Sequence, residues 1–105
     1  MGKSQRTKGA AGEREVCHLI RDHLGIEAKR NLTQTREGGF DIACGPYRLE
    51  VKRRARIGQV YDWMDQAEAS CDEKTRPAVI ARADGKKWLA ILPVEEFLRL
   101  IGNEL

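Results

Sequence analysis

Residues 38–52, with the sequence GGFDIACGPYRLEVK, contain the clearest structural signal in this chain. Its first half predicts a short apolar strand at residues 41–44, and its second half predicts another strand at residues 47–52. Gly45-Pro46 between them predicts a tight turn. The stretch therefore predicts a β-hairpin whose two strands lie side by side.

This hairpin is expected to bring polar side chains together on one face. Side chains alternate along a strand, so Glu50 and Lys52 share one face while Leu49 and Val51 share the other. The hairpin places Asp41 beside Glu50, giving a carboxylate pair with a lysine next to it. Such a group can hold Mg²⁺ and activate a water against a phosphodiester bond. The alternative is a solvated sheet face, which also alternates polar and apolar residues.

Length and composition place the chain among single-domain globular proteins. It has 105 residues, 41% of them hydrophobic and 33% charged, which suffices for one core. The longest apolar run, residues 88–94, is too short to span a membrane, and no export signal is evident. Cys17, Cys44 and Cys71 are odd in number and lack a Cys-x-x-Cys spacing. We expect free thiols in a reducing compartment, hence a cytoplasmic protein that is not secreted.

The charge of the chain is unevenly distributed. The net charge is +3, but residues 1–12 carry no acid and residues 48–57 carry one, whereas residues 61–75 are acidic. A basic face beside a carboxylate site suggests a nucleic-acid substrate; the alternative is that these runs are ordinary solvated surface. The cations expected to contact DNA are Lys3, Arg6, Lys8, Arg36, Arg53, Arg54 and Arg56.

The chain is predicted to form one domain at residues 8–105 behind a flexible basic arm at residues 1–7. Asp84-Gly85 predicts a type I′ turn between the last two strands. The elements beyond the hairpin are a helix at 8–24, a strand at 26–32, a polar loop at 33–38, a basic connector at 53–58, a helix at 59–71, strands at 76–82 and 86–92, and a helix from Pro93. The order α-β-β-β-α-β-β-α predicts an α/β fold, of the α+β kind with a central mixed sheet flanked by helices.

Each predicted helix carries an apolar stripe for the core. Glu13 lies on the stripe of the first helix, whereas Glu15 falls off it. A carboxylate on a buried face is costly unless it is paired or bound to metal, so Glu13 is the stronger candidate for function. The stripes consist of Val16, Cys17, Ile20 and Leu24 in the first helix, Val60, Trp63, Met64, Ala67 and Cys71 in the second, and Val94, Phe97, Leu98 and Ile101 in the last. Trp63 and Trp88 are expected to be core residues.

Four motifs in order carry a resemblance to a known superfamily. They are the helix segment KGAAGERE at residues 8–15, Gly39-Phe40-Asp41, Glu50-Val51-Lys52, and a later helix with Gln66-Ala67. This set resembles the PD-(D/E)XK nucleases over residues 6–101, and its start is similar to archaeal-type and phage Holliday junction resolvases. Gly39-Phe40 stands where the superfamily's name places a proline. The resemblance implies a restriction-endonuclease-like core and a prokaryotic or phage-infected cell.

The resemblance also implies a metal site. Asp41 and Glu50 match the motif's acidic positions and would be the principal ligands of Mg²⁺, for which Mn²⁺ can substitute. The carbonyl of Val51 would be a further ligand, and Glu13 would reach the metal directly or through water. Crowded carboxylates raise one another's pKa, so this site is expected to be strained without a cation.

The remaining implied roles concern catalysis and substrate. Lys52 would orient or help deprotonate the attacking water and stabilise the charge that builds on the phosphate. Gln66 would support the site from behind the metal ligands or contact the phosphate, although an ordinary polar residue at a helix edge explains it equally well. The implied protein is a Mg²⁺-dependent endonuclease of branched DNA that acts as a homodimer, without a membrane or a nucleotide cofactor. The alternatives are a same-fold nuclease acting on duplex, nicked or flapped DNA, and a non-catalytic DNA-binding module.

Overall fold

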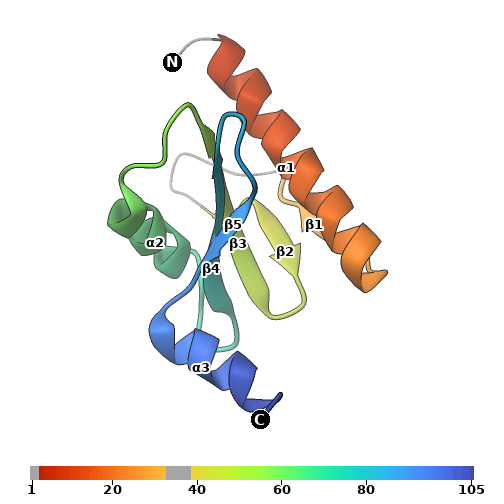
Figure 1. The fold of residues 1–105 in the computed structure, drawn as a ribbon, viewed down its shortest axis with the longest axis vertical. Coiled ribbons are helices and arrows are strands. Elements are labelled where there is room, and N and C mark those ends of the chain that lie inside the picture. The colour runs from red at the N-terminus through yellow and green to blue at the C-terminus, as the bar shows by residue number, and fades with distance from the viewer. Residues whose placement is uncertain (1–2, 33–38) are drawn as a thin grey trace.

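The computed structural model describes residues 3–32 and 39–105 and confirms the predicted order of elements. Three helices surround a five-stranded sheet (Figure 1). The elements are α1 (Lys3–Leu24), β1 (Lys29–Arg30), β2 (Ile42–Cys44), β3 (Tyr47–Arg54), α2 (Val60–Ala69), β4 (Arg76–Ala83), β5 (Leu89–Ile91) and α3 (Val94–Gly102). None of the described helices combines the length and the apolar character that a membrane span needs.

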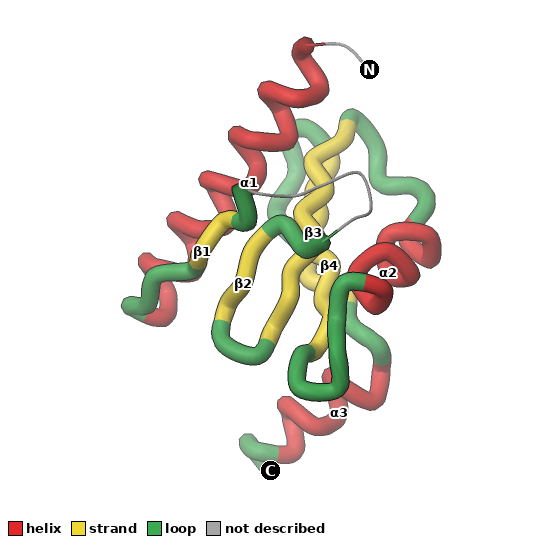
Figure 2. Tube along the Cα trace, turned by 180° about the vertical axis from the view of Figure 1, so that it is seen from behind, coloured by secondary structure: helices red, strands yellow, loops and turns green. Residues whose placement is uncertain are grey.

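The sheet is mixed, as predicted, and its strands lie in the order β1-β2-β3-β4-β5. Strands β3 and β4 are parallel, and every other neighbouring pair is antiparallel. The parallel pair needs a crossover connection, which α2 provides. Figure 2 shows β1, β2 and β3 side by side, with α1 next to β1 and α2 next to β4. The central strand β3 is thus flanked on both edges.

Hydrophobic residues fill both sides of the sheet. One cluster lies under α1 and consists of Val16, Ile42, Leu49, Val51 and Ala78. The other lies under α2 and consists of Trp63, Ala67, Val79 and Ala81. The split follows the alternation of side chains along the strands, and it confirms that Leu49 and Val51 face away from Glu50. Trp63 is buried as predicted, Trp88 packs partly buried on the first cluster, and the three cysteines are free.

Several boundaries differ from prediction. Helix α1 begins at Lys3, five residues before the expected start at Lys8. The predicted strand at 26–32 shortens to β1, and Ile26 and Leu32 are exposed. Its partner β2 has three residues, and beyond the paired residues the Asn31 amide donates to the Asp41 carbonyl at 2.9 Å. The strand predicted at 86–92 likewise shortens to β5.

The turn after β4 is not the type I′ turn that Asp84-Gly85 predicted. Gly85 has φ of 75°, but Asp84 does not have positive φ, and type I′ requires it at both residues. The Asp84 amide instead donates to the Arg54 carbonyl at 2.9 Å. Strand β4 therefore keeps pairing with β3 to its last residue, and the connection to β5 is longer than a two-residue hairpin.

The predicted buried face of α3 is wrong for three of its four residues, whereas the fourth, Ile101, is half-buried. Val94 is 62% exposed, and Phe97 and Leu98 are also exposed. The buried residue of the helix is Glu96, whose carboxylate lies 3.2 Å from Arg76 of β4 and 3.0 Å from Arg99. The polar contacts of Glu96 hold α3 at the end of the sheet (Figure 1), so its apolar stripe turns outward. Leu24, predicted to lie on the buried stripe of the first helix, is also exposed.

Candidate active site

The carboxylate of Asp41 is fixed at the open end of β2. The register pairs Ile42 with Leu49, which sets Asp41 opposite Glu50. The Asp41 amide donates to the Leu49 carbonyl at 2.9 Å, and the amide of Val51 donates to Asp41 Oδ2 at 2.8 Å. The predicted carboxylate pair therefore forms, and backbone hydrogen bonds of the hairpin hold it in place.

Glu50 is a buried carboxylate, and burial disfavours its charged form. Only 3% of the residue is exposed, and the pKa of its carboxyl is raised from 4.5 to about 7. Burial is the largest cause of this rise; the negative charge of Asp41 and a hydrogen bond to it add to it, and the Lys52 ammonium opposes it. Lys52 Nζ lies 3.6 Å from Glu50 Oε2. Without a further cation, this carboxylate is poorly compensated.

Lys52 is held between the sheet and α2. Its Nζ donates to Gln66 Oε1 at 2.9 Å, so α2 reaches the same group as the hairpin. The side chain of Lys52 is 11% exposed, which limits the positions its ammonium can take. Lys52 thus bridges a carboxylate of β3 and an amide of α2, and the structure brings four of the predicted residues together.

Glu13 is placed differently from the other acids. Its Oε1 accepts from Arg30 Nε at 3.0 Å, joining α1 to β1. Burial raises the pKa of the Glu13 carboxyl; the hydrogen bond from Arg30 opposes that rise and the charge of Asp41 adds to it. Within residues 3–32 and 39–105, no three His, Cys, Asp or Glu side chains gather into a metal-binding group. The structure pairs Asp41 with Glu50 and joins Glu13 to arginine.

The donor set still fits Mg²⁺. This ion is held in proteins by one or two carboxylates, with waters and substrate phosphates completing the shell. Asp41 and Glu50 supply two carboxylates. The Val51 amide points toward Asp41, and the carbonyl of a strand residue points to the same side as its amide. Two carboxylates and a backbone carbonyl therefore meet at one edge of β3.

A family model described as "Phage putative PDDEXK endonuclease" matches residues 4–104. The chain belongs to this endonuclease family. The match confirms the predicted PD-(D/E)XK superfamily, whereas the resemblance to Holliday junction resolvases stays a prediction. Neither the curated proteins nor the solved structures contain a match to the chain.

The basic residues predicted to meet DNA in this endonuclease lie in different surroundings. Arg54 and Arg56 are exposed. Arg53 points to the α1 face, where its guanidinium lies 3.4 Å from Glu15. The side chains of Lys3, Arg6 and Lys8, and all of Arg36, lie outside the described part of the structure.

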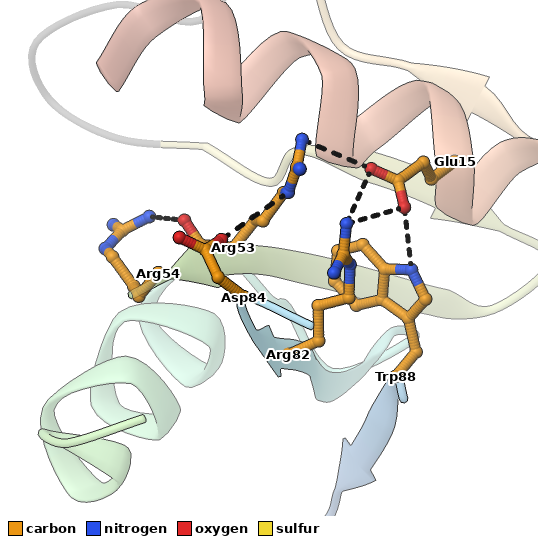
Figure 3. Close-up of polar contacts among 6 residues, drawn as sticks. All are labelled: Glu15, Arg53, Arg54, Arg82, Asp84 and Trp88. Carbon is orange, nitrogen blue, oxygen red and sulfur yellow. Dashed lines mark hydrogen bonds and ion pairs between the residues drawn. The ribbon is translucent and has the colours of Figure 1, made fainter. Parts of the chain in front are cut away.

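Sequence reasoning missed the part that Glu15 plays. Its carboxylate accepts from Trp88 Nε1 at 3.3 Å and lies 3.2 Å from Arg82 NH2, in addition to Arg53 (Figure 3). The register of β3 and β4 places Arg53 opposite Arg82. One carboxylate of α1 thus joins two strands and the approach to β5. The helical stripe gave no sign of this, since Glu15 lies beside the stripe and its partners are distant in sequence.

Proposed function

We propose that the protein is a Mg²⁺-dependent DNA endonuclease that hydrolyses phosphodiester bonds and acts on branched DNA as a Holliday junction resolvase. The observation that carries the proposal is the group formed by Asp41, Glu50, Lys52 and Gln66 on the α2 face of the sheet. Membership of an endonuclease family supports it independently.

Asp41, Glu50 and the Val51 carbonyl would hold the metal, for which Mn²⁺ can substitute. When bound, Mg²⁺ supplies a Lewis acid and a water of lowered pKa. The two carboxylates hold that cation at one place, and its charge offsets the cost of ionising buried Glu50. We assign Glu13 a role through water, because its carboxylate is bonded to Arg30.

Lys52 is the proposed electrostatic catalyst. Gln66 fixes its ammonium at 2.9 Å, and Glu50 lies 3.6 Å away. An ammonium held in place costs no reorganisation when negative charge develops on the phosphate. Loss of one such donor lowers kcat by roughly 10²–10³-fold, which is the effect we expect for Lys52→Ala.

Cleavage of a four-way junction would require the protein to be a dimer. A four-way junction needs two symmetric cuts, and a two-fold dimer supplies two symmetric sites. The outward apolar stripe of α3, with Val94, Phe97 and Leu98 exposed, supports a homodimer, since such stripes are usually covered. The same catalytic group would also serve cleavage of duplex, nicked or flapped DNA, so substrate competition decides between them.

Cleavage of a labelled four-way junction and a matched duplex tests the proposal, with Mg²⁺, with EDTA, and with Lys52→Ala. Lys74→Ala is the matched control, because Lys74 is an exposed lysine outside the site. Symmetric junction nicks that need Mg²⁺ and Lys52, and survive in the control, establish the resolvase. Equal metal-dependent cutting of duplex keeps the endonuclease and removes the junction preference. Tight binding without cutting under any metal supports a binding module instead.

A second measurement tests the metal without relying on cleavage. Mg²⁺ at ten times its Kd should add about 1.4 kcal/mol to the free energy of unfolding. Asp41→Asn should abolish most of that gain, because it removes one of the two carboxylates. An equal gain in wild type and variant would exclude this pair as the metal site.

A further inference from the structure

Two cationic segments, far apart in sequence, meet at the end of the sheet that follows Lys52. Arg54 and Arg56 are exposed where β3 ends, and Lys86 and Lys87 are exposed in the turn after β4. The hydrogen bond from the Asp84 amide to the Arg54 carbonyl fixes the two segments side by side. Helix α1 begins at the same end of the molecule (Figure 1).

Side-chain contacts on both sides of the turn after β4 hold it in place. Glu15 binds Arg82 and Trp88 on either side of the turn, and the Arg82 guanidinium lies 5.4 Å from the centre of the Trp88 ring (Figure 3). Arg53 lies 4.0 Å from Asp84 as well as beside Glu15. Both ends of the turn are therefore tied to α1 and β3. A turn held in this way loses little conformational freedom when its lysines meet a ligand.

The end of the sheet formed by the C-terminus of β3 and the turn after β4 is strongly positive. Residues 53–56 and 82–88 contain six arginines and lysines and one acid, Asp84. Glu15 adds a second carboxylate from α1, and it is already shared between two guanidiniums. Arg54, Arg56, Lys86 and Lys87 remain exposed. A surface of this kind fits a row of phosphates, which is the ligand that such cations bind without reading sequence.

The distance to the candidate active site also fits a nucleic-acid backbone. A strand rises about 3.3 Å per residue, so the end of β3 at Arg54 lies roughly 7 Å beyond Lys52. One DNA strand rises about 3.4 Å per nucleotide. A backbone with its reacting phosphate at Lys52 would thus carry neighbouring phosphates over this end of the sheet.

We propose that the turn after β4, through Lys86 and Lys87, is a second phosphate-binding element for the nucleic-acid substrate. The turn would bind phosphates together with Arg54 and Arg56. These arginines lie where β3 ends, beyond Lys52. The inference rests on the proposed nuclease function and extends it, because it assigns substrate contacts to a segment about thirty residues beyond the predicted basic connector.

The test measures binding of a labelled DNA duplex by anisotropy across a salt series in EDTA, so that no cleavage interferes. The variant is Lys86→Ala with Lys87→Ala. The matched control is Lys29→Ala with Lys74→Ala, which removes the same charge from exposed lysines outside the turn. Two lost phosphate contacts should flatten the salt slope by about 1.8 and weaken binding about 60-fold at 0.1 M salt. The control should keep the wild-type slope.

The outcomes separate this inference from the proposed function. If the turn variant and the control keep the same slope as the wild type, the turn makes no phosphate contact and the inference is overturned, while the nuclease proposal stands. If the turn variant and the control variant weaken binding equally, only the net charge of the protein matters, and the inference is again overturned. If the wild type binds no DNA at any salt concentration, the proposed function fails together with the inference.

Discussion

Replacing Glu50 by glutamine should stabilise the metal-free protein at alkaline pH. The carboxyl of Glu50 is almost fully buried, and its pKa rises from 4.5 to about 7 because burial penalises the charged form. A carboxyl whose pKa is raised by folding binds its proton more tightly in the folded state. Ionising it therefore costs folding free energy, and glutamine, with similar shape and no charge, avoids that cost.

The pH range and the magnitude of this stabilisation follow from the pKa of the Glu50 carboxyl in the unfolded and folded states. Below about pH 4.5 the carboxyl is protonated in both states, so it has no effect on stability. Between pH 4.5 and 7 the unfolded chain ionises first and stability falls. Above pH 7 the full cost applies, and a pKa rise from 4.5 to about 7 corresponds to about 3 kcal/mol. We expect Glu50→Gln to recover most of this at pH 8.

Urea denaturation between pH 4 and 8.5 in EDTA measures the effect. The free energy of unfolding of Glu50→Gln should exceed that of the wild type at pH 8, and the two should converge near pH 4.5. Glu68→Gln is the control, because Glu68 is an exposed carboxylate on α2, and it should follow the wild type throughout. With saturating Mg²⁺ the order should reverse, since glutamine offers the metal one charge fewer.

The reasoning is refuted if Glu50→Gln is less stable than the wild type at pH 8 in EDTA. The ion pair with Lys52 at 3.6 Å would then outweigh the cost of burial. A constant difference across the pH range would also refute it, because the effect would then come from packing and not from ionisation.

Three other predictions test the scaffold around the site. Gly12→Ala should destabilise the protein by about 1–3 kcal/mol, since a Cβ there would lie 3.2 Å from Arg53 Cβ; Gly9→Ala, with open space around it, should be neutral or stabilising in thermal unfolding. Glu96→Gln should lower the melting temperature at pH 7, because the hydrogen bond from Arg99 lowers the pKa of the Glu96 carboxyl; the deficit should shrink as the pH falls below the ordinary value of 4.5 toward the folded pKa. Deleting residues 1–7 should weaken DNA binding and flatten its salt dependence; an unchanged salt slope would exclude these residues from the interface.

The hairpin and its chemistry could be predicted from the sequence because they are local. The alternation of Leu49-Glu50-Val51-Lys52 sets which side chains share a face, and the Gly45-Pro46 turn sets which residues oppose one another. Asp41 beside Glu50 follows from these two rules alone, and the register confirms it. The family match over residues 4–104 agrees with the superfamily that the motifs indicated.

The errors fall where a residue's surroundings come from distant segments. The apolar stripe of α3 was predicted to be buried, yet Glu96 is buried because Arg76, twenty residues earlier, provides its partner. The turn at Asp84-Gly85 was predicted to be type I′, but Asp84 lacks the positive φ that this turn type requires, and its amide pairs with Arg54 of β3. Helical and turn patterns indicate which local conformation a residue favours. They do not indicate which other segment the helix or turn packs against.

The order of elements, the mixed sheet and the carboxylate pair with its lysine can be predicted from sequence patterns, because alternation along strands and periodicity along helices are properties of the local chain. The bond of Glu13 to Arg30, and those of Glu15 to Arg53, Arg82 and Trp88, depend on how distant segments pack. The parallel pairing of β3 with β4 sets Arg53 beside Arg82, so that both guanidiniums reach Glu15. That pairing crosses some thirty residues, and no short-range pattern carries its register.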